Sequence, residues 1–280
     1  TPIKSSAASD VYKRQMIQCI KTELYKTTHN RYFIISLFSL LLLIVVHIAL
    51  NIIPYYGMIY GEYPETVFNH WIGLQLSSLS NIYYMVVVGC ATLPIGMVYI
   101  EERQHGYMNQ LITRSNRTKI AISKLIAYFV TGFIITTIPL IVDYMAASVF
   151  LPSIRPIAAT SYYTVSGNSF LSDLFYTNPT AYLFIYIAID GVLVSFFSLL
   201  VVLAAKIIQN IYAAVCCPMV VVIVLKIVLG FINAENYIPM RILYPSTSEG
   251  IKTANVVMVI ALTGVIGIIG MICEVGKYET

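Results

Sequence analysis

Six long apolar segments constrain the fold of this chain more than any other feature. They cover about residues 32–53, 82–100, 120–142, 181–205, 211–232 and 255–273. Each has close to the twenty or so apolar residues that a helix needs to cross a bilayer. Leu37–Val46 and Met219–Leu225 are almost continuously apolar, whereas the strands of a membrane barrel alternate polar and apolar residues. The sequence therefore predicts an all-α integral membrane protein with six transmembrane helices.

The low share of charged residues excludes a water-soluble protein. Charged residues occupy 11% of the 280 positions and hydrophobic residues 58%, whereas soluble domains carry about 25% charged residues. Six crossings use nearly the whole chain and leave no room for a separate soluble domain. We therefore expect a single transmembrane domain over residues 16–280.

The first fifteen residues differ from the rest of the chain. They are polar, and Asp10–Gln15 resembles the translation of a transposon-end sequencing adapter. We expect residues 1–15 to be a non-native tail, disordered if native, and Met16 to be the true start.

Basic residues predict the orientation of the spans through the positive-inside rule. Outside or bordering the spans, ten bases fall on one side of the membrane and three on the other, which places both termini in the cytoplasm (N-in, C-in). The ten are Lys21, Lys26, Arg31, Arg103, Arg114, Arg117, Lys119, Lys124, Lys206 and Lys277, and the three are Arg155, Arg241 and Lys252. The predicted outer connections are rich in tyrosine and contain Trp71, as expected of an aromatic belt.

Two predicted cytoplasmic segments have helical periodicity. Residues 16–31 place Ile17, Ile20 and Leu24 on one side and charged residues on the others, which favours a helix lying in the membrane interface. Residues 101–119 place Tyr107 with Leu111 and Met108 with Ile112 at i,i+4 spacing, which favours a short helix that docks on a partner. The alternatives are a charged flank and a basic loop that only set topology or contact anionic lipid.

These two segments also carry a resemblance to a known family. The run through Glu101, Glu102, Gly106-Tyr107, Leu111, Thr113-Arg114 and Lys124 resembles the signature E-x(4)-G-[YT]-x(3)-L of bacterial ABC-2 type permeases. Lys21–Lys26 resembles the K-x-E-L-x-K motif of the same family. Trp71-Ile72-Gly73 and Ile138-Pro139-Leu140 are placed like motifs of its Gram-positive branch. The resemblance extends from Met16 to the end of the chain.

The resemblance implies a permease with a cytoplasmic coupling helix that contacts an ATPase subunit and an N-terminal interfacial helix beside it. Short re-entrant outer helices usually follow span five in this family, but residues 233–250 are polar here and depart from that pattern. The residues implied for the ATPase contact are Glu101, Glu102, Gly106, Tyr107, Gln110, Leu111 and Arg114, and those of the interfacial helix are Lys21, Glu23, Leu24 and Lys26.

The chain lacks the phosphate-binding motif G-x(4)-G-K-[ST], so we expect no ATP hydrolysis and no cofactor bound by the chain itself. The resemblance implies that ATP and magnesium are held by a separate ATP-binding subunit and that a second permease subunit completes the path. It also implies a bacterial plasma membrane location, contact with the lipid bilayer, no nucleic-acid partner, and export of a hydrophobic or amphipathic compound such as a drug or an antimicrobial peptide.

Ionisable residues within the spans are costly and therefore informative. Asp190 and Lys226 lie roughly two turns from the outer ends of spans four and five, where a lone charge costs roughly 3 kcal/mol. We expect a structural ion pair, the alternatives being a role in the substrate path or no contact. Asp143 is expected to reach water, and His47 to pack as a neutral side chain or to bond another helix. The five cysteines lack metal-ligand spacing and are expected to be small buried hydrophobes.

Three other functions compete with the permease interpretation. A secondary transporter or a non-transporting immunity or signalling protein would also have many spans. Glu101-Glu102 with His47-x(3)-Asn51 is similar to the pattern of intramembrane CAAX-type metal-dependent proteases. That pattern requires Arg where this chain has Gly106 and places the glutamates before the histidines, so the protease interpretation fails.

Overall fold

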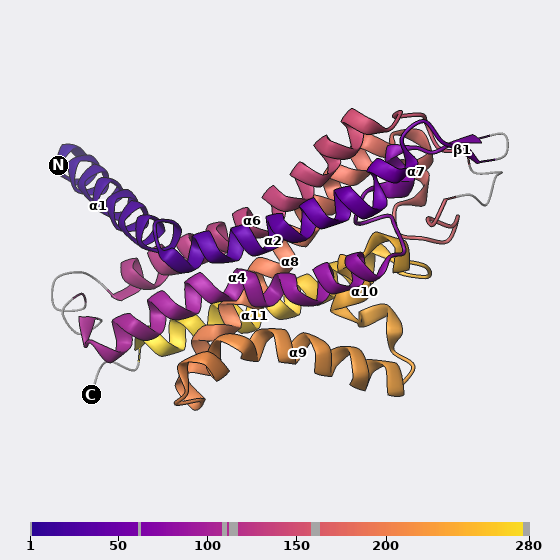
Figure 1. The fold of residues 1–280 in the computed structure, drawn as a ribbon. Helices are drawn as coiled ribbons and strands as arrows, with labels where there is room; N and C mark the ends of the chain where they lie inside the picture. Colours follow the sequence, from indigo (N-terminus) through magenta and orange to yellow (C-terminus); the bar gives the residue numbers. More distant parts are fainter. Residues whose placement is uncertain (1, 61–62, 108–110, 112–116, 158–162, 277–280) are drawn as a thin grey trace.

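A computed structural model describes residues 2–60, 63–107, 111, 117–157 and 163–276 of the chain (Figure 1). In this part of the chain the fold is helical, apart from one antiparallel pair of two-residue strands, β1 (Ile59–Tyr60) and β2 (Tyr63–Pro64). The all-α fold class is therefore confirmed.

Six of the described helices are long and apolar enough to cross a membrane, one for each predicted span. Successive helices run in opposite directions, so the two ends of the chain lie at the same end of the bundle (Figure 1). We call that end the α1 end and the opposite one, which carries β1, α7 and α10, the far end. The six are α2 (Arg31–Asn51), α4 (Ser78–Gln104), α6 (Arg117–Phe150), α8 (Pro179–Ile207), α9 (Ile211–Phe231) and α11 (Thr253–Gly276).

Polar side chains set where several of these helices begin. The side chain of Asn30 accepts a hydrogen bond from the backbone of Tyr32, and Ser77, Asn178 and Asn210 cap α4, α8 and α9 in the same way. Such caps satisfy backbone N–H groups that have no partner within the helix. The helix starts are therefore encoded locally, next to each apolar run.

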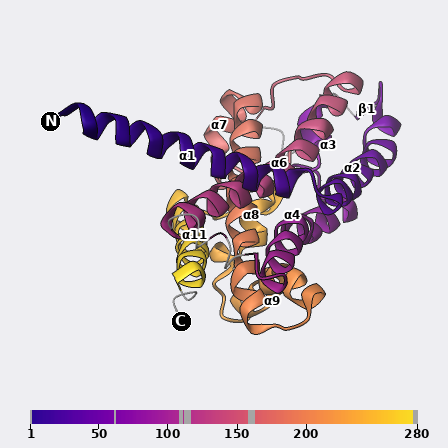
Figure 2. The same ribbon diagram turned by 90° about the vertical axis from the view of Figure 1, so that its left-hand side faces the viewer.

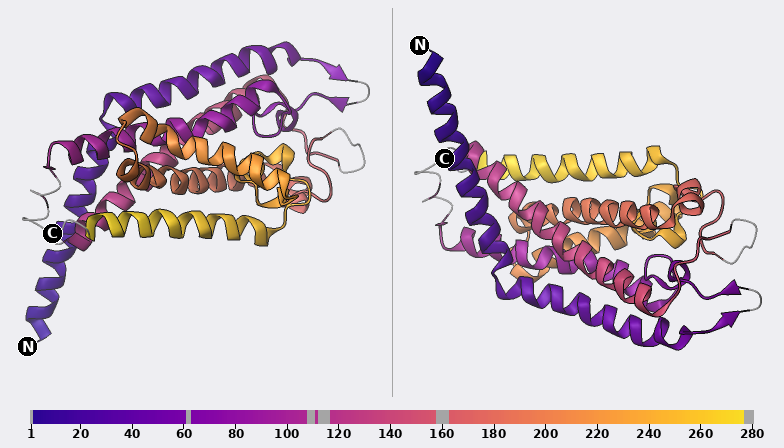
Figure 3. Two further views of the ribbon diagram at one scale, coloured as in Figure 1. Left: turned by 90° about the horizontal axis from the view of Figure 1, so that it is seen from below. Right: turned by 90° about the horizontal axis from the view of Figure 1, so that it is seen from above.

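Helix α8 lies at the centre of the bundle and packs against α4, α6, α9 and α11 (Figure 3). Small residues permit its closest approach to α6. A Cβ on Gly191 would lie 2.6 Å from the ring of Phe133, and a Cβ on Gly132 would lie 3.2 Å from the Cα of Ser195. Membrane helices commonly pack through such small residues, because backbones that approach closely gain contact area without a hydrophobic driving force.

The outward faces of α2, α9 and α11 carry large exposed apolar side chains, including Phe38, Phe231 and Leu262. This surface suits contact with lipid, and the six apolar helices make the chain a multi-pass membrane protein by length and composition. Cys216 and Cys273 also lie exposed on α9 and α11, so the expectation that all five cysteines are buried is wrong for these two.

The segment between α2 and α4 folds back into the bundle instead of staying at its surface. It contains a 3-10 helix, η1 (Ile53–Tyr55), and the short helix α3 (Val67–His70). Trp71 is fully buried, and its indole Nε1 donates a hydrogen bond to the carbonyl oxygen of Leu140 on α6 at 3.2 Å. The prediction of Trp71 in a headgroup belt is therefore wrong, because tertiary packing takes up the whole ring.

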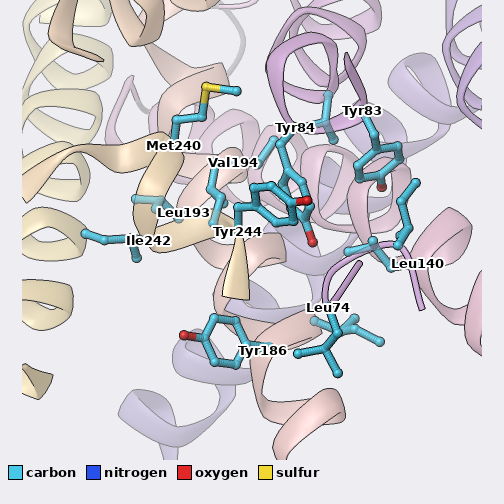
Figure 4. Close-up of a cluster of buried hydrophobic side chains, with 14 of the residues drawn as sticks. Leu74, Tyr83, Tyr84, Leu140, Tyr186, Leu193, Val194, Met240, Ile242 and Tyr244 are labelled. Carbon is cyan, nitrogen blue, oxygen red and sulfur yellow. The ribbon is translucent and has the colours of Figure 1, made fainter. Parts of the chain in front are cut away.

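Short helices do follow α9, although the polar sequence there argued against them. They are η2 (Glu235–Tyr237), α10 (Pro239–Leu243) and η3 (Pro245–Thr247). Met240, Ile242 and Tyr244 point inward from this segment into the main core (Figure 4). The ring of Tyr244 stacks on that of Tyr84, with 4.9 Å between the centroids. On the other side of the far end, α7 (Ser172–Thr177) packs against α8.

Helix α1 (Pro2–Thr28) extends from the bundle as one long helix (Figure 2). It packs mainly against α6, with further contacts to α4. The helix begins at Pro2 and runs through Met16 without a break, so the expectation that residues 2–15 are disordered if native is wrong. That residues 1–15 are a non-native tail stays a prediction.

Candidate functional site

Four charged side chains from three helices meet at the α1 end and form a closed ring of ion pairs, the four-charge cluster. Glu23 and Lys26 come from α1, Glu102 from α4 and Lys124 from α6. Lys26 Nζ lies 3.0 Å from Glu23 Oε1 and 2.7 Å from Glu102 Oε1. Lys124 Nζ lies 2.8 Å from Glu23 Oε2 and also binds Glu102 Oε2. Each carboxylate thus accepts from both lysines, and the four charges sum to zero.

The cluster is largely shielded from solvent. The side chain of Lys124 is fully buried and that of Lys26 is 26% exposed, with the two carboxylates between these limits. Burial opposes ionisation of Glu23, but the charges of Lys124 and Lys26 outweigh it and lower the pKa of the carboxyl. Burial likewise opposes the charge of Lys26, but Glu102 and Glu23 outweigh it and raise the pKa of the amine. Glu23 and Lys26 are therefore charged near neutral pH.

Local sequence brings the members together. Glu23 and Lys26 stand three residues apart and share one face of α1. One turn further, the hydroxyls of Thr27 and Thr131 lie 2.7 Å apart and hold α1 on α6. Glu102 lies in the last turn of α4, and the partners of Arg103 include the carbonyl oxygen of Ala205 near the end of α8, at 2.7 Å. The end of α4 is therefore bound both to the four-charge cluster, through Glu102, and to α8, through Arg103.

Gly106 ends α4 next to the cluster. Its φ of +66° is a left-handed conformation that glycine adopts readily, and its backbone N–H bonds the carbonyl of Arg103 at 3.3 Å. The chain then turns so that the ring of Tyr107 lies against the cluster, with Lys26 Nζ 4.3 Å from the ring centroid. This distance is that of a cation–π contact. Gly106 thus has a clear structural role as the helix stop that positions Tyr107.

Two hollows border Tyr107. A shallow one of about 740 Å³ opens beside Lys26, Arg31, Glu101 and His105. A smaller one of about 160 Å³ lies between α1 and α6, where Tyr107 and Leu111 line the same space as Cys19, Glu23 and Ile120. The two members of the predicted Tyr107–Leu111 ridge therefore face one groove, and both residues are helical. This surface lies between α1 and the membrane-spanning helix α6 and presents both charged and apolar side chains.

The other residues implied by the resemblance do not all lie on one helix or on one surface. Glu101 and Glu102 belong to α4 and not to a helix within the connection, so their assignment to a separate coupling helix is corrected. On α1, Lys21 points to solvent, whereas Leu24 packs partly against the core. Gln110 and Arg114 lie outside the described residues.

The predicted ion pair between Asp190 and Lys226 is not formed. The buried carboxyl of Asp190 has a single described partner, the hydroxyl of Tyr84, which donates to Oδ2 at 3.4 Å. Lys226 is exposed on α9. The two residues lie on adjacent helices, but their side chains point into different surroundings.

His47, Gln75 and Asp143 form a second buried polar group, at the far end, which we call the His47 cluster. His47 Nδ1 lies 2.8 Å from Asp143 Oδ1, and His47 Nε2 lies 2.8 Å from Gln75 Oε1. Asp143 Oδ2 accepts the backbone N–H of Ile72 at 2.8 Å. The expected hydrogen bond of His47 to another helix is confirmed. The expectation that Asp143 reaches water is wrong, since its side chain is fully buried.

Sequence reasoning missed the pairing of Lys124 with Glu23, although a signal was present. Lys124 lies inside the third predicted span, where an unpaired ammonium is costly, yet it counted only as a base that sets topology and as part of the family resemblance. A search for a counter-charge would have found Glu23 and Glu102 near the same predicted membrane face. The partners of Asp143 are His47 and the backbone N–H of Ile72. The second carries no such signal, because every residue except proline has a backbone N–H.

No protein-family model and no curated protein matches this chain.

Proposed function

We propose that the chain is the membrane-spanning permease subunit of an ABC transporter. The observation that carries the proposal is the four-charge cluster, which fastens α1 to the adjoining ends of α4 and α6 directly beside Tyr107 and Leu111. A partner that presses on this surface acts on two spans at once. Motion applied there is transmitted into the bundle, because the ion pairs and the Arg103 contact resist local deformation.

The proposed assembly has two further kinds of subunit. A separate ATP-binding protein hydrolyses ATP and docks on the surface formed by Tyr107, Leu111 and α1. A second permease copy or homologue encloses the path, and the proposed cargo is a hydrophobic or amphipathic compound exported from a bacterial cell. The exposed apolar faces of the outer helices supply the surface for lipid and for the second permease.

Co-expression of the chain with the open reading frames that flank its gene on the source DNA tests the proposal. We expect a protein with a nucleotide-binding motif to co-purify and its ATPase activity to change when the permease is bound. Gly106→Trp and Leu111→Asp should abolish that change while leaving membrane insertion intact. Gly57→Trp is the matched control, because Gly57 also has a positive φ and open space around it but lies at the far end. Unchanged coupling in both test variants, or capture of no ATPase, contradicts the proposal.

Secondary transport is the second candidate, and the buried ionisable side chains favour it. Asp190 has a carboxylate oxygen without a described partner, and Asp143 pairs with His47 inside the bundle. Intramembrane groups of this kind serve as proton or ion sites in secondary transporters. Flux in vesicles separates the candidates. Uptake that requires a proton gradient and persists without ATP supports secondary transport, whereas uptake lost only on removal of ATP supports the permease.

A further inference from the structure

A pocket of about 320 Å³ opens at the far end, where α9, α10 and the first turn of α4 meet. Such a volume is at the lower limit of small-ligand sites. Its walls are both apolar and charged: Ile238 and Met240 contribute buried apolar side chains, whereas Lys226 and Arg241 contribute positive charge. We call this space the far-end pocket.

The two cations of the far-end pocket differ in what neutralises them. The guanidinium of Arg241 binds Glu235 Oε2 at 2.7 Å and donates to the carbonyl oxygens of Thr247 and Glu249 at 3.0 and 3.2 Å. Within the described part of the chain, no residue hydrogen-bonds or pairs with the ammonium of Lys226. The pocket therefore holds one positive charge that the described residues leave unbalanced.

Lys226 also lies at an unusual depth. It precedes the last residue of α9 by five positions, which places its Cα roughly 8 Å along the axis from the helix end. The exposed side chains beside it, Val224 and Ile227, are apolar and suited to lipid tails. A lysine at this level extends its flexible stem toward the headgroup region, where lipid phosphates are found.

The part of the pocket that Gly230 lines is open. Gly230 lines the pocket one helical turn beyond Lys226, and a Cβ built on it would meet no atom within 4 Å. A small anionic group entering here would meet Lys226, while attached acyl chains would lie along the apolar outer face of α9.

We propose that the far-end pocket binds the phosphate headgroup of an anionic lipid, with Lys226 as the cation that pairs with it. The net positive charge of the pocket selects an anionic headgroup over a zwitterionic one. The apolar surface next to it selects a lipid over free phosphate. The site is independent of the proposed ATPase contact, which lies at the other end of the bundle.

Native mass spectrometry of the detergent-solubilised full chain tests the site, with phosphatidylglycerol as the probe and phosphatidylcholine as the comparison. The wild type should retain one phosphatidylglycerol in preference to phosphatidylcholine. Lys226→Gln should weaken retention about five-fold, the contribution typical of one lysine near an anionic surface. Gly230→Leu should weaken it as well, since the leucine fills the space while the charge remains. Lys226→Arg and Lys252→Gln, the latter at an exposed lysine of the far end outside the pocket, should bind as the wild type does.

Three outcomes would overturn the proposal. Unchanged retention in both Lys226→Gln and Gly230→Leu would mean that Lys226 only extends to bulk solvent. An equal loss in Lys252→Gln would mean general surface attraction. Displacement of the lipid by excess inorganic phosphate would identify the ligand as free phosphate. The assay needs no ATPase, so its failure and that of the permease proposal are distinguishable.

Discussion

Helix α6 takes part in two buried polar clusters, one near each end, and they are built differently. At the α1 end, Lys124 joins a ring of four long charged side chains whose outermost member, Lys26, is partly exposed. At the far end, Asp143 has a short side chain that is fully buried and bonds an imidazole and a backbone N–H. Both clusters join distant segments and both border a hollow, but Gln75 is the member that lines it at the far end, whereas the charged Lys26 and Glu102 line it at the α1 end.

Both clusters hold helices together, and they differ in how far their members are exposed to solvent. Lys26 is the member of the four-charge cluster that reaches water, so it can exchange a carboxylate for water at a lower cost than the buried Lys124 can. Asp143 is fully buried and accepts a hydrogen bond from the backbone of a segment packed between helices, so its loss leaves that N–H without an acceptor. We therefore expect changes in the His47 cluster to affect stability, and changes in the four-charge cluster to affect stability and also the position of α1 and its coupling to a partner.

The largest effect is expected for Asp143→Ala. The change removes the acceptor of the Ile72 N–H and of His47 Nδ1 and should lower the free energy of unfolding by about 4 kcal/mol. Thermal unfolding in detergent measures it. Asp173→Ala, at an exposed site on the same end, should change stability by less than about 0.5 kcal/mol. If Asp143→Ala had an effect as small as that of the Asp173→Ala control, the His47 cluster would not be distinguished by its contribution to stability.

A somewhat smaller effect is expected for Lys124→Met. The variant leaves the carboxylates of Glu23 and Glu102 facing one another without their shared buried cation and should cost about 3 kcal/mol. Adding Glu102→Gln should restore about half of the loss, since Glu23 keeps Lys26 as partner. The same unfolding assay reports both, with Lys21→Met at an exposed site of α1 as control. Strictly additive losses in the double variant would mean that the ring does not act as a unit.

The docking of α1 on α4 and α6 should weaken in acid and should not change with pH near neutrality. The pKa of Glu23 is lowered in the folded state, so its stabilising contribution is present above the ordinary glutamate range and is lost as pH falls through the lowered value. The pKa of Lys26 is raised, so its contribution is lost only in strong alkali. In a variant whose other cysteines are replaced by serine, the distance between spin labels on Cys19 and on a cysteine placed at Ile122 should stay constant near neutral pH and broaden only below the ordinary pKa range of glutamate. Broadening near pH 7 would contradict the assignment of charged partners.

The smallest effect on stability is expected for Gly106→Ala. An alanine at φ +66° costs about 1 kcal/mol of backbone strain, since open space surrounds the site and no clash adds to it. Gly167→Ala, also in open space but without a positive φ, should be nearly neutral. A loss of ATPase coupling in Gly106→Ala that exceeds its loss of stability would show that coupling depends on the turn at Gly106, where α4 ends. Parallel losses would assign the glycine a structural role alone.

The sequence alone determined the number of membrane-spanning helices and most of their positions. The predicted span 211–232 compares with Ile211–Phe231 and the predicted span 181–205 with Pro179–Ile207. An apolar run of this length forms a helix in a bilayer, because a helix satisfies the backbone hydrogen bonds within the segment itself. Capping side chains mark where several of these helices start. The third span shows where this reasoning ends. Residues 120–142 were predicted and Arg117–Phe150 is observed, because Asp143 argued for an exit to water that its buried partners make unnecessary.

The tertiary structure decided which charges meet. Lys26, Glu102 and Lys124 are far apart in the chain, and hydropathy treats each of them as a marker of a membrane boundary. Only the packing of α1 across α4 and α6 turns these markers into one closed ring, and only the folding back of residues 67–75 gives Asp143 a backbone partner. Hydropathy is a local property of the chain, whereas the partner of a buried charge depends on how helices far apart in sequence come to lie side by side.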